Sequence, residues 1–178
     1  DKTGAFLIID EIQTGFGRTG DWFGFQHADI VPDVVTMAKG IAGGMPMGAV
    51  AWRGDLGQLS SGTHGSTFGG NPLACASAIA TITTLQNENL PQQAQEKGAW
   101  LIEQLTGLNL PAIRDVRGQG LIIGIELKGR VTPVLQALQE RGILALPAGN
   151  TVLRLLPPLI ISYEDLQEIV DTIKEVLE

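Results

Sequence analysis

The hydrophobic pattern changes character about halfway along the chain. In the first half, apolar runs rich in β-branched residues at positions 5–9 and 34–38 end at Asp10 and Lys39. Short runs of this kind are typical of buried strands in a parallel sheet. A third apolar run predicts a strand at 49–52. The segment 72–86 predicts a helix with Asn71 as its cap, and because it is apolar nearly all round we expect it to be deeply buried.

Residues 87–91 interrupt this pattern and mark a predicted domain boundary. We therefore expect one domain over residues 1–91 and a second over residues 92–178. The second half mixes strands and helices in an irregular order, as in an α+β domain. Its hydrophobic periodicity predicts helices at 91–105 and 131–141 and strands at 113–116, 121–127, 143–146 and 152–155. A last helix is predicted after its cap Ser162, with an apolar face formed by Leu166, Ile169, Val170, Ile173 and Leu177.

Asp10 and Lys39 are the first candidates for chemistry. Ligands of open α/β sheets bind outside the carboxyl ends of the strands, where both residues lie in this prediction. The alternative for Asp10 is a turn cap at the end of its strand. The alternative for Lys39 is an exposed loop lysine, and we weigh the two interpretations of Lys39 about equally. Glycines and a proline crowd the segment after Lys39, so a helix is not expected there.

Two further stretches carry polar groups in informative places. Arg154 interrupts the apolar strand at 152–155, so it either faces water or holds an anion such as a carboxylate. The segment 63–72 places hydroxyls and glycines ahead of a predicted helix, an arrangement that suits an anion. The glycine-rich sequence GFGRTG at 15–20 lacks the spacing of a phosphate-binding loop, and we interpret it as a structural loop.

Composition narrows the class of protein. The net charge of −7 argues against a surface that coats nucleic acid. A single cysteine, Cys75, excludes an intrachain disulfide and fits a reducing compartment, so we expect a cytoplasmic protein. No apolar stretch is long enough for a membrane span, and His27 has no ligand partners at metal-site spacing. Because a buried strand follows Asp1 almost at once, we expect that residues upstream are missing.

Four motifs together resemble a known family, the class III pyridoxal-phosphate aminotransferases. They are DEIQTG at 10–15, AKG at 38–40, HGSTFGGNP at 64–72 and LRLLPPL at 153–159. Each motif is weak alone, but they occur in the order of the family and cover essentially the whole chain. VRGQGL at 116–121 places the resemblance closest to the acetylornithine aminotransferases and to the aminotransferases of carrier-protein-bound aminoadipate semialdehyde.

The resemblance implies a fold and a part of that fold. We expect an α/β chain that forms the C-terminal part of a fold-type I pyridoxal-phosphate-dependent transferase. The first domain would end the large, mainly parallel-sheet cofactor domain, and the second would be the small α+β domain. The family's chain extends well upstream of Asp1, so this chain would hold only part of the site and, alone, bind the cofactor weakly.

The resemblance also assigns roles to residues around pyridoxal phosphate. Lys39 would bond to the cofactor aldehyde and move the substrate proton. Asp10 would pair with the pyridinium nitrogen, Gln13 would donate to the phenolic oxygen, and Ile12 would pack on the ring. Thr67 would reach the phosphate, usually from the partner subunit, which implies a homodimer.

Arg154 would hold a carboxylate of glutamate or 2-oxoglutarate. The implied reaction moves the terminal amine of N-acetylornithine, or of a related blocked or carrier-bound diamino acid, to 2-oxoglutarate. It yields the semialdehyde and glutamate and belongs to arginine or lysine biosynthesis. Two alternatives stay open: another ω-amino acid aminotransferase, for ornithine or 4-aminobutyrate, or a non-catalytic α/β fragment used for binding or dimerisation.

Overall fold

The computed structural model describes residues 3–178 and divides the chain into two compact units. The division falls between Leu90 and Pro91. The predicted domain boundary lies one residue further along, and the identities that we assigned to the two domains stay predictions. None of the helices formed by residues 3–178 is both long and apolar enough to cross a membrane.

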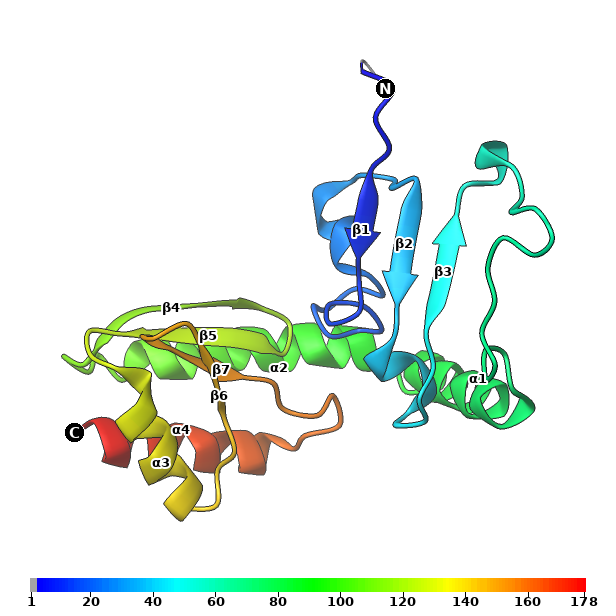
Figure 1. Ribbon diagram of the computed structural model, residues 1–178. Coiled ribbons are helices and arrows are strands. Elements are labelled where there is room, and N and C mark those ends of the chain that lie inside the picture. The colour runs from blue at the N-terminus through cyan, green and yellow to red at the C-terminus, as the bar shows by residue number, and fades with distance from the viewer. Residues whose placement is uncertain (1–2) are drawn as a thin grey trace. The chain divides into compact units, whose positions relative to one another are not determined.

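The first unit is built on a mixed three-stranded sheet of order β1-β2-β3 (Figure 1). The predicted parallel pairing of the first two strands is confirmed, while the third strand pairs antiparallel to the second. The elements are β1 (Ile8–Asp10), β2 (Val34–Met37), β3 (Ala49–Trp52), the 3₁₀ helices η1 (Gly24–Ala28), η2 (Lys39–Ala42) and η3 (Gly54–Leu56), and α1 (Pro72–Asn87).

Small residues let α1 pack closely against η2. The buried Ala42 accepts a hydrogen bond at its carbonyl from Ser77 Oγ at 2.8 Å. A Cβ on Gly43 would lie 2.7 Å from Thr81 Oγ1, so this position has no room for a larger side chain. The segment that follows Lys39 is therefore fixed on a helix rather than left as a free loop.

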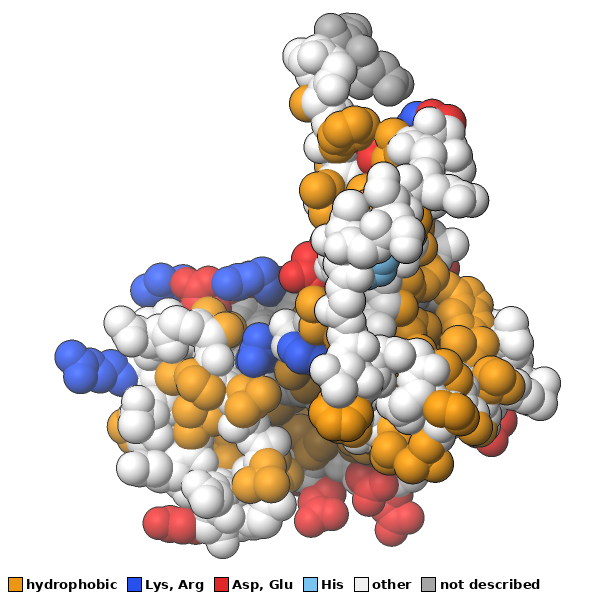
Figure 2. Space-filling model, turned by 45° about the vertical axis from the view of Figure 1, so that its right-hand side comes forward, with side chains coloured by type: hydrophobic (Ala, Val, Ile, Leu, Met, Phe, Trp, Pro, Cys, Tyr) orange, Lys and Arg blue, Asp and Glu red, His pale blue; other side chains and the backbone are white. Residues whose placement is uncertain are grey.

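The expected burial is wrong for the apolar run at 5–9 and for part of α1, whereas the run at 34–38 is half-buried. Phe6 and Ile8 of the first run are 68% and 61% exposed, and Leu73 and Ile79 of α1 are 66% and 67% exposed. Hydrophobic side chains accordingly reach the surface of this unit (Figure 2). An apolar pattern shows which elements can be buried, but burial also needs another layer of structure against each apolar face.

The second unit is an antiparallel four-stranded sheet of order β4-β5-β7-β6 with three helices. Its elements are α2 (Leu90–Gly107), β4 (Ile113–Gln119), β5 (Ile122–Leu127), α3 (Val131–Glu140), β6 (Leu146–Ala148), β7 (Val152–Leu155) and α4 (Tyr163–Leu177). The predicted strand at 143–146 is wrong, because the strand that pairs with β7 begins at Leu146. Leu144, an apolar residue inside the predicted strand, is instead 85% exposed.

The helices of the second unit cover one face of its sheet. Residues of β5 and β7 alternate between buried and half-buried positions, as expected for strands with one face on a core. The buried face packs against the helices in a cluster of aliphatic side chains that includes Leu101, Leu105, Ile123, Ile125, Leu138, Leu153, Leu155, Leu166 and Ile173. The other face carries Gly124, Glu126 and Arg154.

Candidate active site

The carboxyl ends of β1 and β2 bring the first candidate residues to one edge of the sheet. Asp10, the last residue of β1, is in register with Thr36 of β2. The next residue, Glu11, donates its backbone N–H to the Thr36 carbonyl at 2.9 Å. Lys39 is the second residue after the end of β2. Because the strands are parallel, the segments that carry Asp10 and Lys39 leave the sheet at the same edge.

Asp10 has an exposed carboxylate that begins a turn. Its Oδ1 accepts a hydrogen bond from the backbone N–H of Ile12 at 2.9 Å. The turn-capping interpretation of Asp10 is therefore confirmed. This bond occupies one carboxylate oxygen of an exposed side chain, so the turn leaves a second oxygen available for a ligand. Ile12 and Gln13, the next two candidates, lie half-buried in this turn.

Lys39 occupies a strained backbone position. Its φ of 45° lies in the left-handed region, which residues with a Cβ rarely adopt. Strained backbone of this kind is concentrated at functional sites. The side chain of Lys39 is exposed, and the following Gly40 lies against Phe16, whose Cβ would be 3.4 Å from a Cβ added at Gly40. The expectation of no helix after Lys39 is wrong, because one 3₁₀ turn forms before Gly43 and Gly44.

Glu11, to which the sequence assigned no role, organises the loop beside these residues. Its side chain is only 1% exposed and accepts hydrogen bonds from the backbone N–H groups of Gly24 at 3.0 Å and Phe25 at 2.8 Å. It also accepts from the hydroxyl of Thr14. A buried carboxylate needs such donors to offset its lost hydration. Glu11 thus closes the loop 11–25 next to Asp10. No local sequence signal distinguishes it from an exposed acid.

The GFGRTG segment forms the wall of this closed loop. Phe16 and Thr19 are buried in it, and burial lowers the pKa of the Arg18 guanidinium. Thr19 Oγ1 lies 3.1 Å from His27 Nε2, and the other ring nitrogen of His27 lies 3.1 Å from Asp21. The loop is therefore held by side chains of the chain itself, which supports the structural interpretation of GFGRTG.

Thr67 lies exposed on the loop that leads into α1. The predicted cap at Asn71 is confirmed, since its Oδ1 accepts from the Ala74 N–H at 2.9 Å and its Nδ2 donates to the Phe68 carbonyl at 3.0 Å. A hollow of about 420 Å³ opens beside this loop, lined by residues that include Pro46, Ser66, Phe68 and Gly69. A helix N-terminus next to such a hollow can hold an anion.

Arg154 lies in the second unit, at the middle of the sheet face that the helices leave uncovered. It is in register with Gly124 on β5 and with Leu146 on β6, neither of which carries a polar side chain. Its Nε is buried and has no hydrogen-bond partner among residues 3–178. Arg154 lies on the non-core face of its strand, as simple alternation predicts, and is partly accessible there. A buried donor without a partner is costly, and a bound carboxylate would satisfy it.

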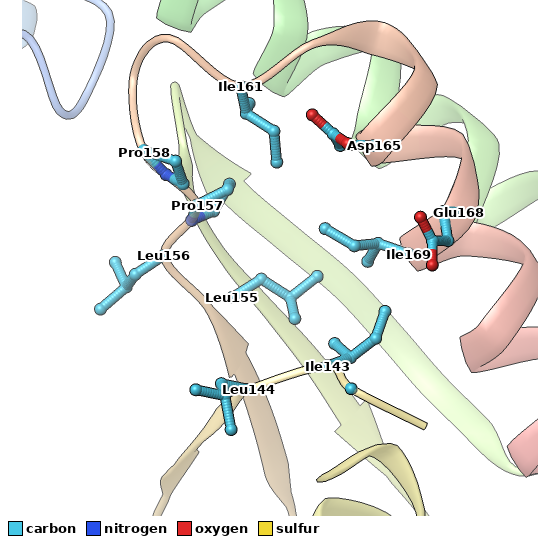
Figure 3. Close-up of a pocket in the computed structure, with 11 residues that line it drawn as sticks. Ile143, Leu144, Leu155, Leu156, Pro157, Pro158, Ile161, Asp165, Glu168 and Ile169 are labelled. Carbon is cyan, nitrogen blue, oxygen red and sulfur yellow. The ribbon is translucent and has the colours of Figure 1, made fainter. Parts of the chain in front are cut away.

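An apolar hollow of about 290 Å³ in the second unit is lined by none of the six predicted site residues (Figure 3). It is bounded by the segment after β7 and by one face of α4. Ile143, Leu155 and Ile169 point into it, and Glu168 lies at its rim. Asp165, also at the rim, is engaged by the Ser162 hydroxyl in the cap of α4. The hollow therefore offers no convergent polar groups for chemistry.

The comparison with known proteins decides the family. Residues 1–177 match the family described as Aminotransferase class-III. The chain belongs to the class III aminotransferases. The resemblance that the four motifs predicted is thereby confirmed. Asp10, Ile12, Gln13, Lys39 and Thr67 lie in one unit of this class III chain, and Arg154 lies in the other.

Curated relatives and solved structures agree with this assignment. The chain is 45% identical to the acetylornithine aminotransferase of Methanosarcina mazei, covering 98% of this chain and 44% of the relative. It is also 45% identical to the [LysW]-aminoadipate semialdehyde transaminase of Deinococcus radiodurans, covering 99% and 42%. An aminotransferase structure from Bacillus anthracis matches with a TM-score of 0.93 at 37% identity, covering 99% and 45%. The chain thus spans less than half the length of these relatives, and its fold is that of pyridoxal-phosphate aminotransferases.

Proposed function

We propose that this chain is part of a pyridoxal-phosphate-dependent enzyme that moves the terminal amine of N-acetylornithine, or of a related blocked or carrier-bound diamino acid, to 2-oxoglutarate. The products would be the semialdehyde and glutamate, in arginine or lysine biosynthesis. The observation that carries the proposal is that Asp10 and Lys39 follow the carboxyl ends of two parallel paired strands, in a chain of the class III family.

The residues at this edge fit the cofactor. When bound, pyridoxal phosphate supplies a reactive aldehyde and a ring that accepts electrons. Lys39, exposed on a fixed backbone, would hold the group and, as a neutral amine, move the proton at the substrate carbon that bears the amine. Asp10, with one carboxylate oxygen outside its turn, would keep a proton on the ring nitrogen. Gln13 would donate to the phenolic oxygen, and Ile12 would cover one ring face.

The remaining two residues would orient the charged ends of the ligands. Thr67, on the exposed loop beside the capped start of α1, would donate its hydroxyl to the phosphate, and we propose that it does so across a homodimer. Arg154, whose Nε is buried without a partner among residues 3–178, would bind a carboxylate of glutamate or 2-oxoglutarate. Two N–H donors of a planar guanidinium fix the orientation of a carboxylate as a lysine could not.

Ornithine is the second candidate amino donor. The chain is 44% identical to the ornithine aminotransferase of an Exiguobacterium species and 46% identical to that of Brevibacillus brevis. These identities match those to the acetylornithine enzymes. The acetyl group distinguishes the two donors, because it removes the charge of the α-amine. A comparison of kcat/KM for N-acetylornithine and ornithine would therefore decide between them.

Borohydride trapping tests the proposal directly. The purified protein is mixed with pyridoxal phosphate, reduced with borohydride and digested, and the labelled lysine is found by mass spectrometry. We expect the label on Lys39, its loss in Lys39→Ala and its persistence in Lys128→Ala, a matched exposed lysine. Glutamate added before reduction should remove the label, because it takes the place of Lys39. Labelling spread evenly over exposed lysines would refute the proposal and favour the non-catalytic alternative.

A further inference from the structure

The motif DEIQTG contains residues to which the proposed function gives no role. Asp10, Ile12 and Gln13 would contact the cofactor ring, and Glu11 and Thr14 have no part in that contact. These two residues are bonded to each other, because the hydroxyl of Thr14 donates to Oε2 of Glu11. The bond closes the segment that contains Ile12 and Gln13, and this segment begins directly after Asp10.

Glu11 is a fixed anchor for this bond. Its side chain is 1% exposed, and its Oε2 also accepts from the backbone N–H of Gly24 at 3.0 Å. Its Oε1 accepts from the backbone N–H of Phe25 at 2.8 Å. A buried carboxylate that rotated out of these bonds would lose donors that it could not replace with water. The position of Thr14 is therefore set by η1 through Glu11, and not by the turn alone.

The backbone of Glu11 connects the same turn to β2. Its N–H donates to the carbonyl of Thr36 at 2.9 Å, and its carbonyl accepts from the N–H of Gly15 at 3.0 Å. Lys39 is the third residue after Thr36 on the segment that leaves β2. One residue thus joins the turn after β1, the start of η1 and the strand that leads to Lys39.

The last residue of the motif, Gly15, is required by the same arrangement. A Cβ at Gly15 would lie 2.9 Å from the carbonyl oxygen of Glu11 and 3.2 Å from the ring of Phe23. The first of these atoms belongs to the backbone, so no side-chain rotation can make room. A Cβ at Gly24 would lie 3.4 Å from both carboxylate oxygens of Glu11. The two glycines let the turn and η1 approach the buried carboxylate closely.

We propose that Glu11 and Thr14 act as positioning residues for the turn that faces the cofactor ring. This inference rests on the proposed function, in which Asp10 meets the ring nitrogen and Gln13 meets the phenolic oxygen. Those two atoms belong to one rigid ring, so both side chains can reach them only if the turn between Asp10 and Gln13 has a fixed shape. Groups of a site must be held to within about 0.5 Å, and a displacement of about 1 Å can cost about a hundredfold in rate.

The test uses Thr14, because its substitution leaves the buried carboxylate of Glu11 in place. Thr14→Val keeps the size of the side chain and removes the hydroxyl, whereas Thr14→Ser keeps the hydroxyl. Hydrogen exchange of the Ile12 backbone N–H is measured without cofactor, since this N–H donates to Asp10 Oδ1 at 2.9 Å. We expect exchange about tenfold faster in Thr14→Val and a wild-type rate in Thr14→Ser. Equal rates in wild type and Thr14→Val would overturn the inference.

The second measurement follows the orientation of bound pyridoxal phosphate. Visible circular dichroism, divided by the absorbance of the bound cofactor, depends on how the ring is held and not on the fraction of protein that is folded. We expect Thr14→Val to bind pyridoxal phosphate about tenfold more weakly and to change this ratio, and Thr14→Ser to restore both. Leu85→Ala is the control, because it removes a buried side chain of α1 in the same unit and should leave the ratio unchanged.

The outcomes separate this inference from the proposed function. A wild-type protein that binds no pyridoxal phosphate would refute the proposed function. Binding by the wild type together with an unchanged ratio in Thr14→Val would refute the positioning role alone. An equal change of the ratio in Leu85→Ala would also refute it, because any loss of stability in the first unit would then have the same effect.

Discussion

Gly98 is the position where one added methyl group should do the most damage. It lies in α2, directly beneath the turn between β4 and β5. A Cβ added at Gly98 would lie 1.9 Å from the carbonyl oxygen of Gly120 and 2.4 Å from its carbonyl carbon. Both are backbone atoms, so no side-chain rotation can relieve the clash. Gly98→Ala therefore forces α2 away from the sheet by roughly 1 Å or more in a close-packed core.

The magnitude follows from two opposing effects. Overpacking a core costs about 1–3 kcal/mol when side chains can adjust, and a clash with backbone lies at or above the upper end. Alanine is a better helix former than glycine by about 1 kcal/mol, which offsets part of this cost. We expect Gly98→Ala to destabilise the second unit by about 2–4 kcal/mol. With a urea m-value of roughly 1.5 kcal/mol/M, the unfolding midpoint would fall by about 2 M.

The assay is urea unfolding followed by the fluorescence of Trp100, which reports on the second unit. Trp100 packs edge-on against Tyr163 of α4 at a ring distance of 5.4 Å. Trp22 and Trp52 are replaced by Phe in all samples so that only Trp100 emits. Gly107→Ala is the matched control in the same helix, because a Cβ there meets nothing within 4 Å. Equal midpoints for wild type and Gly98→Ala, with equal slopes, would refute the close approach of α2 to the turn.

Three further predictions concern charges and caps. Glu11→Gln should destabilise the first unit by about 2–4 kcal/mol, because a buried carboxylate with three donors is replaced by an amide with one acceptor oxygen. Hydrogen exchange of the backbone amides in the loop 11–25 should then accelerate, and unchanged exchange would contradict the role of Glu11. Ser162→Ala should lower the urea midpoint by removing about 1 kcal/mol of capping from α4, whereas Thr172→Ala within the same helix should not. The folded-state pKa of Glu126 is depressed by the hydrogen bond from Arg117 and then by that from Arg114, so its contribution to stability is present above the usual value of 4.5 and is lost as the pH falls through the folded pKa. NMR of the Glu126 carboxyl carbon should show that Arg117→Gln raises this pKa, and an equal pKa in wild type and variant would exclude the ion pair.

The caps were predictable because they are made within a few residues. Asn71 and Ser162 precede apolar segments at the spacing that a helix N-terminus requires, and both side chains accept the expected backbone N–H. The parallel pairing of β1 and β2 was predictable for a related reason. Two β-branched runs separated by a long connection favour a parallel pair, which brings Asp10 and Lys39 to one edge.

Features that depend on distant partners were not predictable. The apolar residues at 143–146 satisfy the strand pattern, yet β6 begins only at Leu146 because its hydrogen bonds come from β7. Lys97 resembles an exposed helix lysine in the sequence. In the structure it is 8% exposed and donates to the carbonyl of Leu159 at 3.4 Å and to Gln93 at 3.1 Å. Both outcomes depend on groups far away in the chain, which are β7 for the start of β6 and the Leu159 carbonyl for Lys97.

The sequence by itself determined the family, the strand ends that carry Asp10 and Lys39, and the helix caps, because these depend on residue order and short-range geometry. The tertiary structure decided which polar groups are engaged. Only the folded loop shows that Glu11 is buried under three donors. Only the pairing of β4 with β5 shows that Glu126 is held by Arg114 and Arg117. Whether a charge is satisfied depends on groups that are far apart in the chain and meet only when the sheet forms.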